Sequence, residues 1–165
     1  MTAFDDAERR MRAGTAEAYG RTYARVCAYP VPLLLDAAGV TAAVRVLDAG
    51  TGTGTVAMAA GARGATVAAV DADPDMVRLA REASSGAQVS VAALPSLPFA
   101  IGLFDAVVAN FVLNHVGRPL AALRELRRVT RPGRQGVGDD LGPSWRQRAA
   151  TDRPRCPGGR PDQAQ

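Results

Sequence analysis

The sequence predicts an α/β fold in which helices cover a parallel, Rossmann-like sheet. Short β-branched runs alternate with helical segments along the chain, as expected of strand–helix–strand units with right-handed crossovers. A glycine cluster, AGTGTG, directly follows the first of these runs. The 165 residues suffice for one such domain with a hydrophobic core. In a sheet of this kind, ligands bind beyond the carboxyl ends of the strands.

Helices are predicted at five places. Residues 3–28 are rich in Ala, Glu and Arg, with apolar side chains at helical spacing. The run PVPLLLDAAG suits a short helix with prolines in its first turn and Gly39 at its end. Asp73 is a candidate N-cap for a helix that begins at Pro74. The other two helices are expected from about Thr55 to Gly61 and over Leu120–Val129.

Strands are predicted where apolar and β-branched residues form short runs. The four predicted strands are Val44–Leu47, Ala65–Val70, Gln88–Val91 and Phe104–Ala109. The first leads straight into the glycine cluster, and the second is closed by Asp71. The periodicity of the sequence ends after residue 133, so the sheet is expected to stop at these strands.

The composition argues against several function classes. Seven arginines against four acids place a net +3 of the formal +4 charge in residues 131–165, so the basic balance is no sign of nucleic-acid binding. Cys27 and Cys156 are too few for a disulfide framework or a zinc site. The chain has no secretory signal pattern and no apolar run near the ~18 residues of a membrane span. We expect a cytoplasmic protein without a metal, a nucleic-acid partner or a membrane anchor.

The segment Asp48–Gly54 is the strongest candidate for a ligand site. Its glycines allow a tight strand-to-helix turn that a ligand can approach closely, with free N–H groups at the helix N-terminus. The spacing also fits a dinucleotide-binding loop, and a tight turn without any ligand is a further alternative. The Asp48 carboxylate disfavours a pyrophosphate and favours a ligand with an ammonium group and a sulfonium. Asp71 suits the hydroxyls of a ribose in either kind of nucleoside ligand.

Several motifs together resemble those of class I S-adenosylmethionine-dependent methyltransferases, over about residues 15–133. In chain order they are VLDAGTGTGTVA (46–57), VDADPDM (70–76), LPSLPF (94–99), FDAVVANFVLNHV (104–116) and LRELRRVTRPG (123–133). The resemblance implies S-adenosylmethionine as the cofactor and methyl transfer to an acceptor, which we expect to be a small molecule.

The resemblance also implies a set of cofactor-binding residues. Asp48 and the glycines would hold the methionine end of the cofactor, and Asp71 would bind the ribose. Ala72 and Met76 would line the adenine, while Asn110 would lie beside the methionine moiety. The complete predicted set is Tyr19, Tyr23, Asp48, Gly50, Thr51, Gly52, Gly54, Asp71, Ala72, Met76, Ala93, Leu94 and Asn110.

Some of these positions leave alternatives open. Tyr19 and Tyr23 resemble a lid over the cofactor, or they are core aromatics of an amphipathic helix. Ala93 stands where many relatives carry an acid for the adenine amine, so adenine would rely on backbone groups near Ala93 and Leu94. His115, the single histidine, is a candidate general base or a packing residue, so no catalytic residue is assigned.

The resemblance divides the chain into a helical lid at 1–40, an S-adenosylmethionine-binding domain at 41–131 and a tail at 132–165. Residues 131–165 contain 5 Pro and 6 Gly without periodicity, which predicts disorder. Relatives continue with further strands, so we expect an incomplete sheet with Phe104–Ala109 at its edge. A one-base shift near the codon of Gly133 would restore a strand-like sequence. We therefore expect an out-of-frame tail, with natural truncation or a genuine tail as the alternatives.

The first functional hypothesis is therefore an S-adenosylmethionine-dependent methyltransferase, inactive if its C-terminal third is lost. The alternatives are a fragment of an NAD(P)-dependent oxidoreductase that uses the same loop, and a non-catalytic cofactor-binding remnant. The acceptor is not identified, because this family builds its acceptor pocket largely from insertions and from the C-terminal third.

Overall fold

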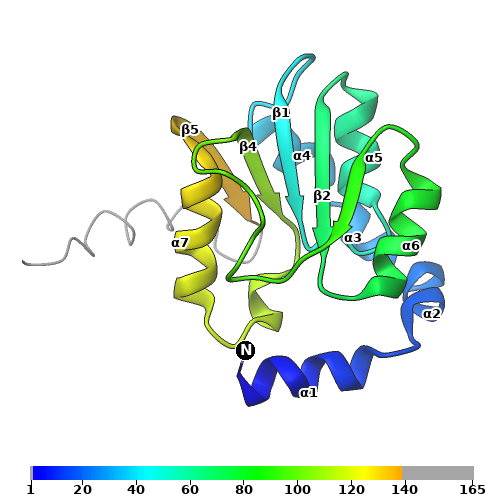
Figure 1. The fold of residues 1–165 in the computed structure, drawn as a ribbon. Coiled ribbons are helices and arrows are strands. Elements are labelled where there is room, and N and C mark those ends of the chain that lie inside the picture. Colours follow the sequence, from blue (N-terminus) through cyan, green and yellow to red (C-terminus); the bar gives the residue numbers. More distant parts are fainter. Residues whose placement is uncertain (1, 139–165) are drawn as a thin grey trace, which may run out of the picture.

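The computed structural model describes residues 2–138, with only the backbone described for 134–138. A five-stranded parallel sheet in the order β3-β2-β1-β4-β5 forms its centre (Figure 1). The strands are β1 (Arg45–Ala49), β2 (Thr66–Asp71), β3 (Gln88–Val91), β4 (Phe104–Ala109) and β5 (Thr130–Gly138). The strand order changes direction between β1 and β4, which is where sheets of this type bind ligands.

The predicted α/β alternation is confirmed, with strand and helix ends within about two residues of those expected. The helices that follow the N-terminal segment are α4 (Val31–Ala37), α5 (Thr55–Ala62), α6 (Pro74–Ala83) and α7 (Pro119–Val129), and η1 (Leu113–His115) is a short 3₁₀ turn. Asp73 caps α6 as predicted, because its side chain accepts a hydrogen bond of 2.8 Å from the Asp75 N–H.

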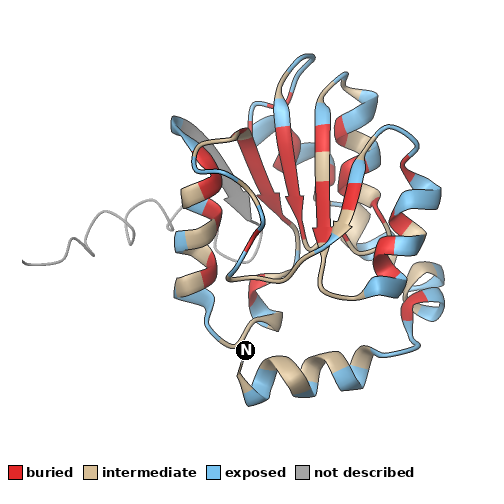
Figure 2. Ribbon diagram, in the orientation of Figure 1, coloured by how far each residue is buried: buried red, intermediate tan, exposed pale blue. Residues whose placement is uncertain are grey.

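Both faces of the sheet are covered, so β1 and β4 are buried on both sides (Figure 2). On one face, Val46 and Val108 pack with the apolar sides of α4, α5 and α6. On the other face, Leu47 and Val107 pack with α7. Alternate residues of a strand thus serve opposite cores, which explains why these strands are apolar runs without alternation.

The N-terminal segment differs from the single helical stretch predicted over 3–28. It forms α1 (Ala3–Arg12), α2 (Ala16–Arg21) and α3 (Tyr23–Ala28). α1 ends where Ala13 becomes extended and Gly14 takes a φ of +74°, a conformation that breaks the helix. No residue of α1 is buried, and the helix runs across the molecule beyond the carboxyl ends of the strands (Figures 1 and 2).

The expected edge position of β4 is wrong, because β5 pairs with it in parallel from Phe104↔Thr130 to Ala109↔Gly138. The pairing is irregular between Phe104 and Ala106, where the chain passes through Pro132 and Gly133. A proline and a glycine are tolerated at such an irregularity of an outer strand. Strand β5 was not predicted from the sequence, because its formation depends on pairing with β4 and not on the strand propensity of its own residues. The rest of the predicted tail, residues 139–165, lies outside the described residues.

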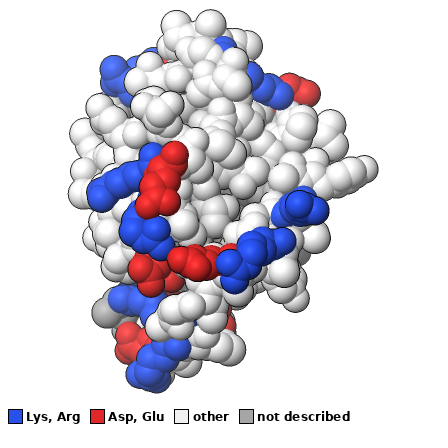
Figure 3. Space-filling model, turned by 90° about the vertical axis from the view of Figure 1, so that its right-hand side faces the viewer, with Lys and Arg blue, Asp and Glu red and all other residues white. Residues whose placement is uncertain are grey.

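The surface over α2 and α6 carries charges of both signs, without a patch of one sign on this face (Figure 3). Arg78 of α6 pairs with Glu82 at 3.0 Å and lies 3.9 Å from Glu17 of α2. Within residues 2–138, no helix is long and apolar enough to cross a membrane, and no cluster of His, Cys, Asp and Glu could hold a metal ion.

Candidate functional site

The glycine loop joins β1 to α5 as a strand-to-helix turn with positive φ values of 76°, 55° and 89° at Gly50, Gly52 and Gly54. A Cβ atom on Gly50 would collide with Val112, and one on Gly54 would lie 3.1 Å from Cα of Ala80 in α6. Both glycines therefore let neighbouring segments approach the loop. Gly52 has more room, since its nearest neighbour would be the Tyr19 ring at 4.0 Å.

Asp48 is fully buried at the end of β1. Its Oδ2 accepts a hydrogen bond of 2.6 Å from the Thr51 hydroxyl. Its Oδ1 has no hydrogen-bond partner of normal geometry among the described residues. Burial raises the pKa of Asp48 to about 7, while the Thr51 hydroxyl and the Ala57 backbone N–H act in the opposite direction. The site therefore contains a buried acceptor that a cationic ligand would stabilise.

Asp71 ends β2, and backbone N–H groups fix its carboxylate. Oδ2 accepts from the Gly52 N–H at 2.8 Å, and Oδ1 accepts from the Asp73 N–H at 3.0 Å. Burial raises the pKa of Asp71, and these two N–H groups lower it. Each carboxylate oxygen has a second lone pair, so the group can still accept two hydroxyl donors.

A cavity of about 140 Å³ opens at this end of the sheet. Five of the predicted site residues line it: Gly50, Asp71, Ala72, Ala93 and Leu94. Eight others do not belong to its lining: Tyr19, Tyr23, Asp48, Thr51, Gly52, Gly54, Met76 and Asn110. Met76, expected against adenine, is a buried residue of α6.

Tyr19, Tyr23 and Asn110 lie outside the cavity lining and make contacts of their own. The Tyr19 hydroxyl lies 3.2 Å from Sγ of Cys27, and its ring stacks on Tyr23 at 6.1 Å between centroids. Burial is the main cause that raises the pKa of Tyr19. Asn110 donates to the Cys27 carbonyl at 2.8 Å, and its buried Oδ1 has no partner among the described residues. Tyr23 is exposed, whereas the Tyr19 ring would lie 4.0 Å from a Cβ atom placed on Gly52.

Sequence reasoning missed the contribution of α1, which lines the cavity with Asp5, Glu8, Arg9 and Arg12. These residues lie three, four and seven positions apart, so a helical wheel places them on one face. The segment after β4, which includes η1, also lines the cavity with Phe111, Val112, His115 and Val116. The charged face of α1 did not predict contact with a cavity, because charged helix faces usually point to solvent.

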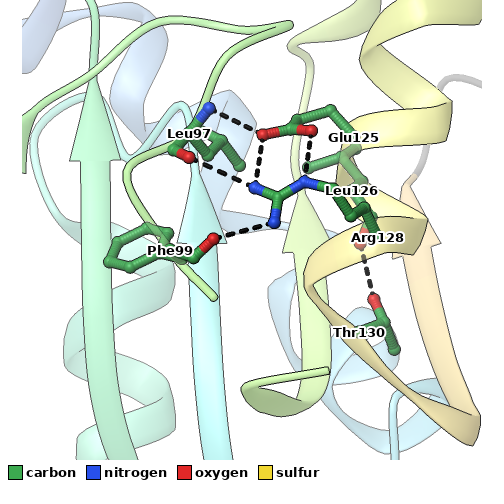
Figure 4. A network of polar contacts seen from close by, with 6 residues as sticks. All are labelled: Leu97, Phe99, Glu125, Leu126, Arg128 and Thr130. Atoms are coloured by element: carbon green, nitrogen blue, oxygen red, sulfur yellow. Dashed lines mark hydrogen bonds and ion pairs between the residues drawn. The ribbon is translucent and has the colours of Figure 1, made fainter. Parts of the chain in front are cut away.

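Ala93 and Leu94 line the cavity, and residues that follow them closely in the chain, Leu97 and Phe99, are held by α7. Figure 4 shows these contacts. Glu125 accepts from the Leu97 N–H at 2.7 Å. Arg128 donates to the carbonyls of Phe99 at 2.8 Å and Leu97 at 3.2 Å, and it also pairs with Glu125. The Arg128 hydrogen bonds are the main cause that lowers the pKa of Glu125. Glu125 and Arg128 of α7 thus hold the loop that continues from the cavity wall.

The fold and the sequence are similar to those of known methyltransferases. Residues 47–136 match the family model of the methyltransferase domain. The chain is 37% identical over 101 residues to demethylmenaquinone methyltransferase of Renibacterium salmoninarum, covering 61% of this chain and 43% of that protein. It is 40% identical over 102 residues to malonyl-[acyl-carrier protein] O-methyltransferase of Erwinia pyrifoliae, covering 62% of this chain and 39% of that protein. The chain thus spans less than half the length of these relatives.

Among solved structures, the fold is similar to that of a TehB-like SAM-dependent methyltransferase from Corynebacterium glutamicum. The TM-score is 0.64 at 22% sequence identity, covering 74% of this chain and 71% of that chain. The domain match extends over more than half of the 165 residues. The chain therefore belongs to the family of this methyltransferase domain, and its fold is that of S-adenosylmethionine-dependent methyltransferases.

Proposed function

We propose that the carboxyl end of the sheet binds S-adenosylmethionine, and that the chain transfers its methyl group to a small-molecule acceptor. The observation that carries this proposal is the Asp71 carboxylate. It is held by two backbone N–H groups beside a cavity that Gly50, Ala93 and Leu94 also line. A fixed carboxylate at the end of the second strand is suited to the hydroxyls of a ribose.

The charges and polar atoms around the glycine loop fit the methionine end of this cofactor. Oδ1 of Asp48 and Oδ1 of Asn110 are buried acceptors without a hydrogen bond of normal geometry among the described residues. A buried acceptor without a donor costs free energy. An ammonium group carries three N–H donors and a positive charge, which would satisfy such atoms and favour the ionised form of Asp48.

The size of the cavity indicates that α1 must move when a cofactor enters. Its volume of about 140 Å³ is well below the ~300–1,000 Å³ usual for ligand pockets. α1 covers the cavity and buries none of its residues, so it is the wall that is easiest to displace. We therefore include α1 in the lid formed by residues 1–40, over an S-adenosylmethionine-binding domain that begins near residue 41.

When bound, S-adenosylmethionine supplies a methyl group that is already activated by its sulfonium. The residues of this chain have to hold the nucleoside at Asp71, neutralise the ammonium at Asp48 and exclude water beneath α1. The two relatives act on demethylmenaquinone and on malonyl-[acyl-carrier protein], as their names state. On the basis of the first of these relatives, we propose a small organic acceptor for this chain.

Calorimetric titration of the full chain with S-adenosylhomocysteine, S-adenosylmethionine and NADH tests this function. We expect saturable binding of the first two and none of NADH. Saturation by NADH alone would support an oxidoreductase fragment and contradict the proposal. Binding of all three with similar affinity would contradict it too, because the loop would then recognise a generic nucleoside.

A further inference from the structure

Four large apolar side chains follow one another along the outer side of α3 and α4. Tyr23, Val26, Tyr29 and Leu33 are 66%, 64%, 86% and 70% exposed, and we define them as the α3–α4 strip. Tyr29 and Pro30, between the two helices, also have helical backbone angles, so a spacing of three or four residues keeps neighbours of the strip on one side. Single exposed apolar residues are common, whereas a continuous row of them marks an interaction surface.

The inner sides of these helices explain why the strip is left outside. In α4, Val31, Leu34 and Leu35 are buried in the core, so Leu33 lies on the opposite side of the helix. α3 has no buried residue at all. Both helices contact α5, which covers one face of the sheet (Figure 1). Within residues 2–138, the strip therefore remains uncovered.

The charges beside the strip have opposite signs in its two halves. Arg25 is exposed and precedes Tyr29 by four positions. Asp36 follows Leu33 by three positions, and 67% of its side chain is exposed although Oδ1 pairs with Arg63 at 2.6 Å. A two-fold axis at Tyr29 would reverse the strip, so that Arg25 of each copy faces Asp36 of the other. The charges are thus self-complementary, as a symmetric interface between two identical surfaces requires.

The strip is large enough for the apolar centre of such an interface. Its four side chains offer on the order of 500 Å2 of exposed surface. A standard interface buries about 800 Å2 on each partner, with an apolar centre and a polar rim. Arg25 and Asp36 lie where this rim is expected. An interface of this size supports a dimer that forms at micromolar concentrations.

We propose that the α3–α4 strip is the interface of a symmetric homodimer. Tyr29 packs against Tyr29 of the second copy at the two-fold axis, where an aromatic pair adds to the burial of apolar surface. Val26 and Leu33 lie on either side of the axis and pack across it against each other. Arg25 of each copy pairs with Asp36 of the other. The dimer does not depend on the proposed function.

A lipid surface fits the strip less well than a second copy. Helices that lie on membranes combine an apolar face with a polar face rich in Lys and Arg. Here the exposed Asp36 carboxylate lies beside Leu33 and would meet the anionic headgroups, which repel it.

The interface would support a segment that the candidate site uses. The Cys27 carbonyl of α3 accepts a hydrogen bond of 2.8 Å from Asn110, and the Tyr19 hydroxyl lies 3.2 Å from Cys27 Sγ. Because α3 has no buried residue in a single copy, burial of Tyr23 and Val26 in the dimer gives the helix an apolar anchor. Hydrogen exchange of α3 amides should therefore be slower in the dimer.

Sedimentation velocity of the full chain, from low to high micromolar concentrations, tests the dimer. We expect a reversible monomer–dimer equilibrium for the wild type. Leu33→Glu should weaken association about tenfold or more, because it places a carboxylate in the centre of the interface. Leu120→Glu is the matched control, since Leu120 is 63% exposed on α7, which covers the other face of the sheet. Hydrogen exchange of α3 should slow with protein concentration in the wild type and in this control, but not in Leu33→Glu.

A charge exchange tests the arrangement of the two copies. Arg25→Glu and Asp36→Arg should each weaken the dimer, and the double variant should restore it. Circular dichroism melts identify any variant that fails to fold, and Val26→Glu then replaces Leu33→Glu. A chain that is monomeric at every concentration overturns the inference, as does equal association of the wild type, Leu33→Glu and Leu120→Glu. A monomer that floats with phosphatidylserine-containing vesicles, and loses this binding in Leu33→Glu, overturns it in favour of a lipid surface.

Discussion

Asp48 and Asp71 are both carboxylates at strand ends, but Asp48 is fully buried and Asp71 is only partly buried. Asp71 is paired on both oxygens by backbone N–H groups and faces the cavity, so it can add ligand hydroxyls to existing contacts. Asp48 has one oxygen without a partner and no share in the cavity lining. Substitutions of Asp48 and Asp71 are therefore expected to affect ligand binding and stability differently.

Asp71→Ala should weaken the binding of S-adenosylhomocysteine by about 1–3 kcal/mol, the usual loss when buried hydroxyls lose a charged partner. The measurement is calorimetric titration of the full chain. Asp75→Ala is the matched control, because Asp75 is an exposed carboxylate of the neighbouring helix turn. Equal affinity of wild type and Asp71→Ala would remove Asp71 from the binding site.

Asp48→Asn should change how stability depends on pH. The raised pKa of Asp48, about 7, means that the folded state binds its proton more tightly than the unfolded state does. Stability is therefore lost as pH rises from the ordinary carboxylate range through about 7, by up to about 4 kcal/mol. Asp71 contributes in the same direction. The lowered pKa values of Asp5 and Glu125 act only at lower pH.

Urea unfolding at about pH 5 and about pH 7.5 measures this effect. The wild type should lose stability between the two values, and Asp48→Asn should lose clearly less. A wild-type slope retained in the variant would show that Asp48 does not titrate in this range.

Single residues at this site were predictable where a motif fixed their place on the fold. Asp71, Ala93 and Leu94 reach the cavity because strand ends and the loops after them meet at one edge of a parallel sheet. Met76 of α6 is buried and does not line the cavity, so its predicted contact with adenine stays a prediction. Glu8 and Arg12 could not be predicted, since the docking of a helix without buried residues leaves no hydrophobic pattern.

At the level of elements, the cavity wall depends on α7. Arg128→Met should leave the carbonyls of Leu97 and Phe99 and the Glu125 carboxylate without their partner. We expect a lower free energy of unfolding and faster hydrogen exchange at the Leu97 amide. Arg127→Met, at an exposed position of the same helix, is the control. An unchanged Leu97 exchange rate would mean that the loop is fixed by other contacts.

The elements themselves were predictable to different degrees. Helix α6 was predicted from its N-cap residue and its first-turn proline, which act locally. Strand β4 was predicted from its apolar run. The break after α1 depends on the backbone at Ala13 and Gly14, and helix composition alone does not mark it. β5 was missed because it is paired by β4 in spite of its proline and glycines.

For the whole molecule, the pairing of β4 with β5 makes β4 an interior strand of the sheet and not an edge strand. A chain cut after Val129 should expose the backbone groups of β4 and form aggregates larger than the assembly of the uncut chain. Size-exclusion chromatography and hydrogen exchange of β4 amides, compared with the 165-residue chain, measure this. A cut chain without such aggregates and with β4 amides equally protected would show that β5 contributes nothing to the sheet.

The docking of α1 also has a kinetic consequence. A helix that is attached by a few charged contacts is loosened by salt, because the Debye length falls to about 8 Å at 0.15 M and shrinks further above it. Opening of α1 should therefore become more frequent as ionic strength rises. Stopped-flow mixing should then give an association rate for S-adenosylhomocysteine that increases with sodium chloride. This is the reverse of ordinary electrostatic steering, in which salt slows the encounter.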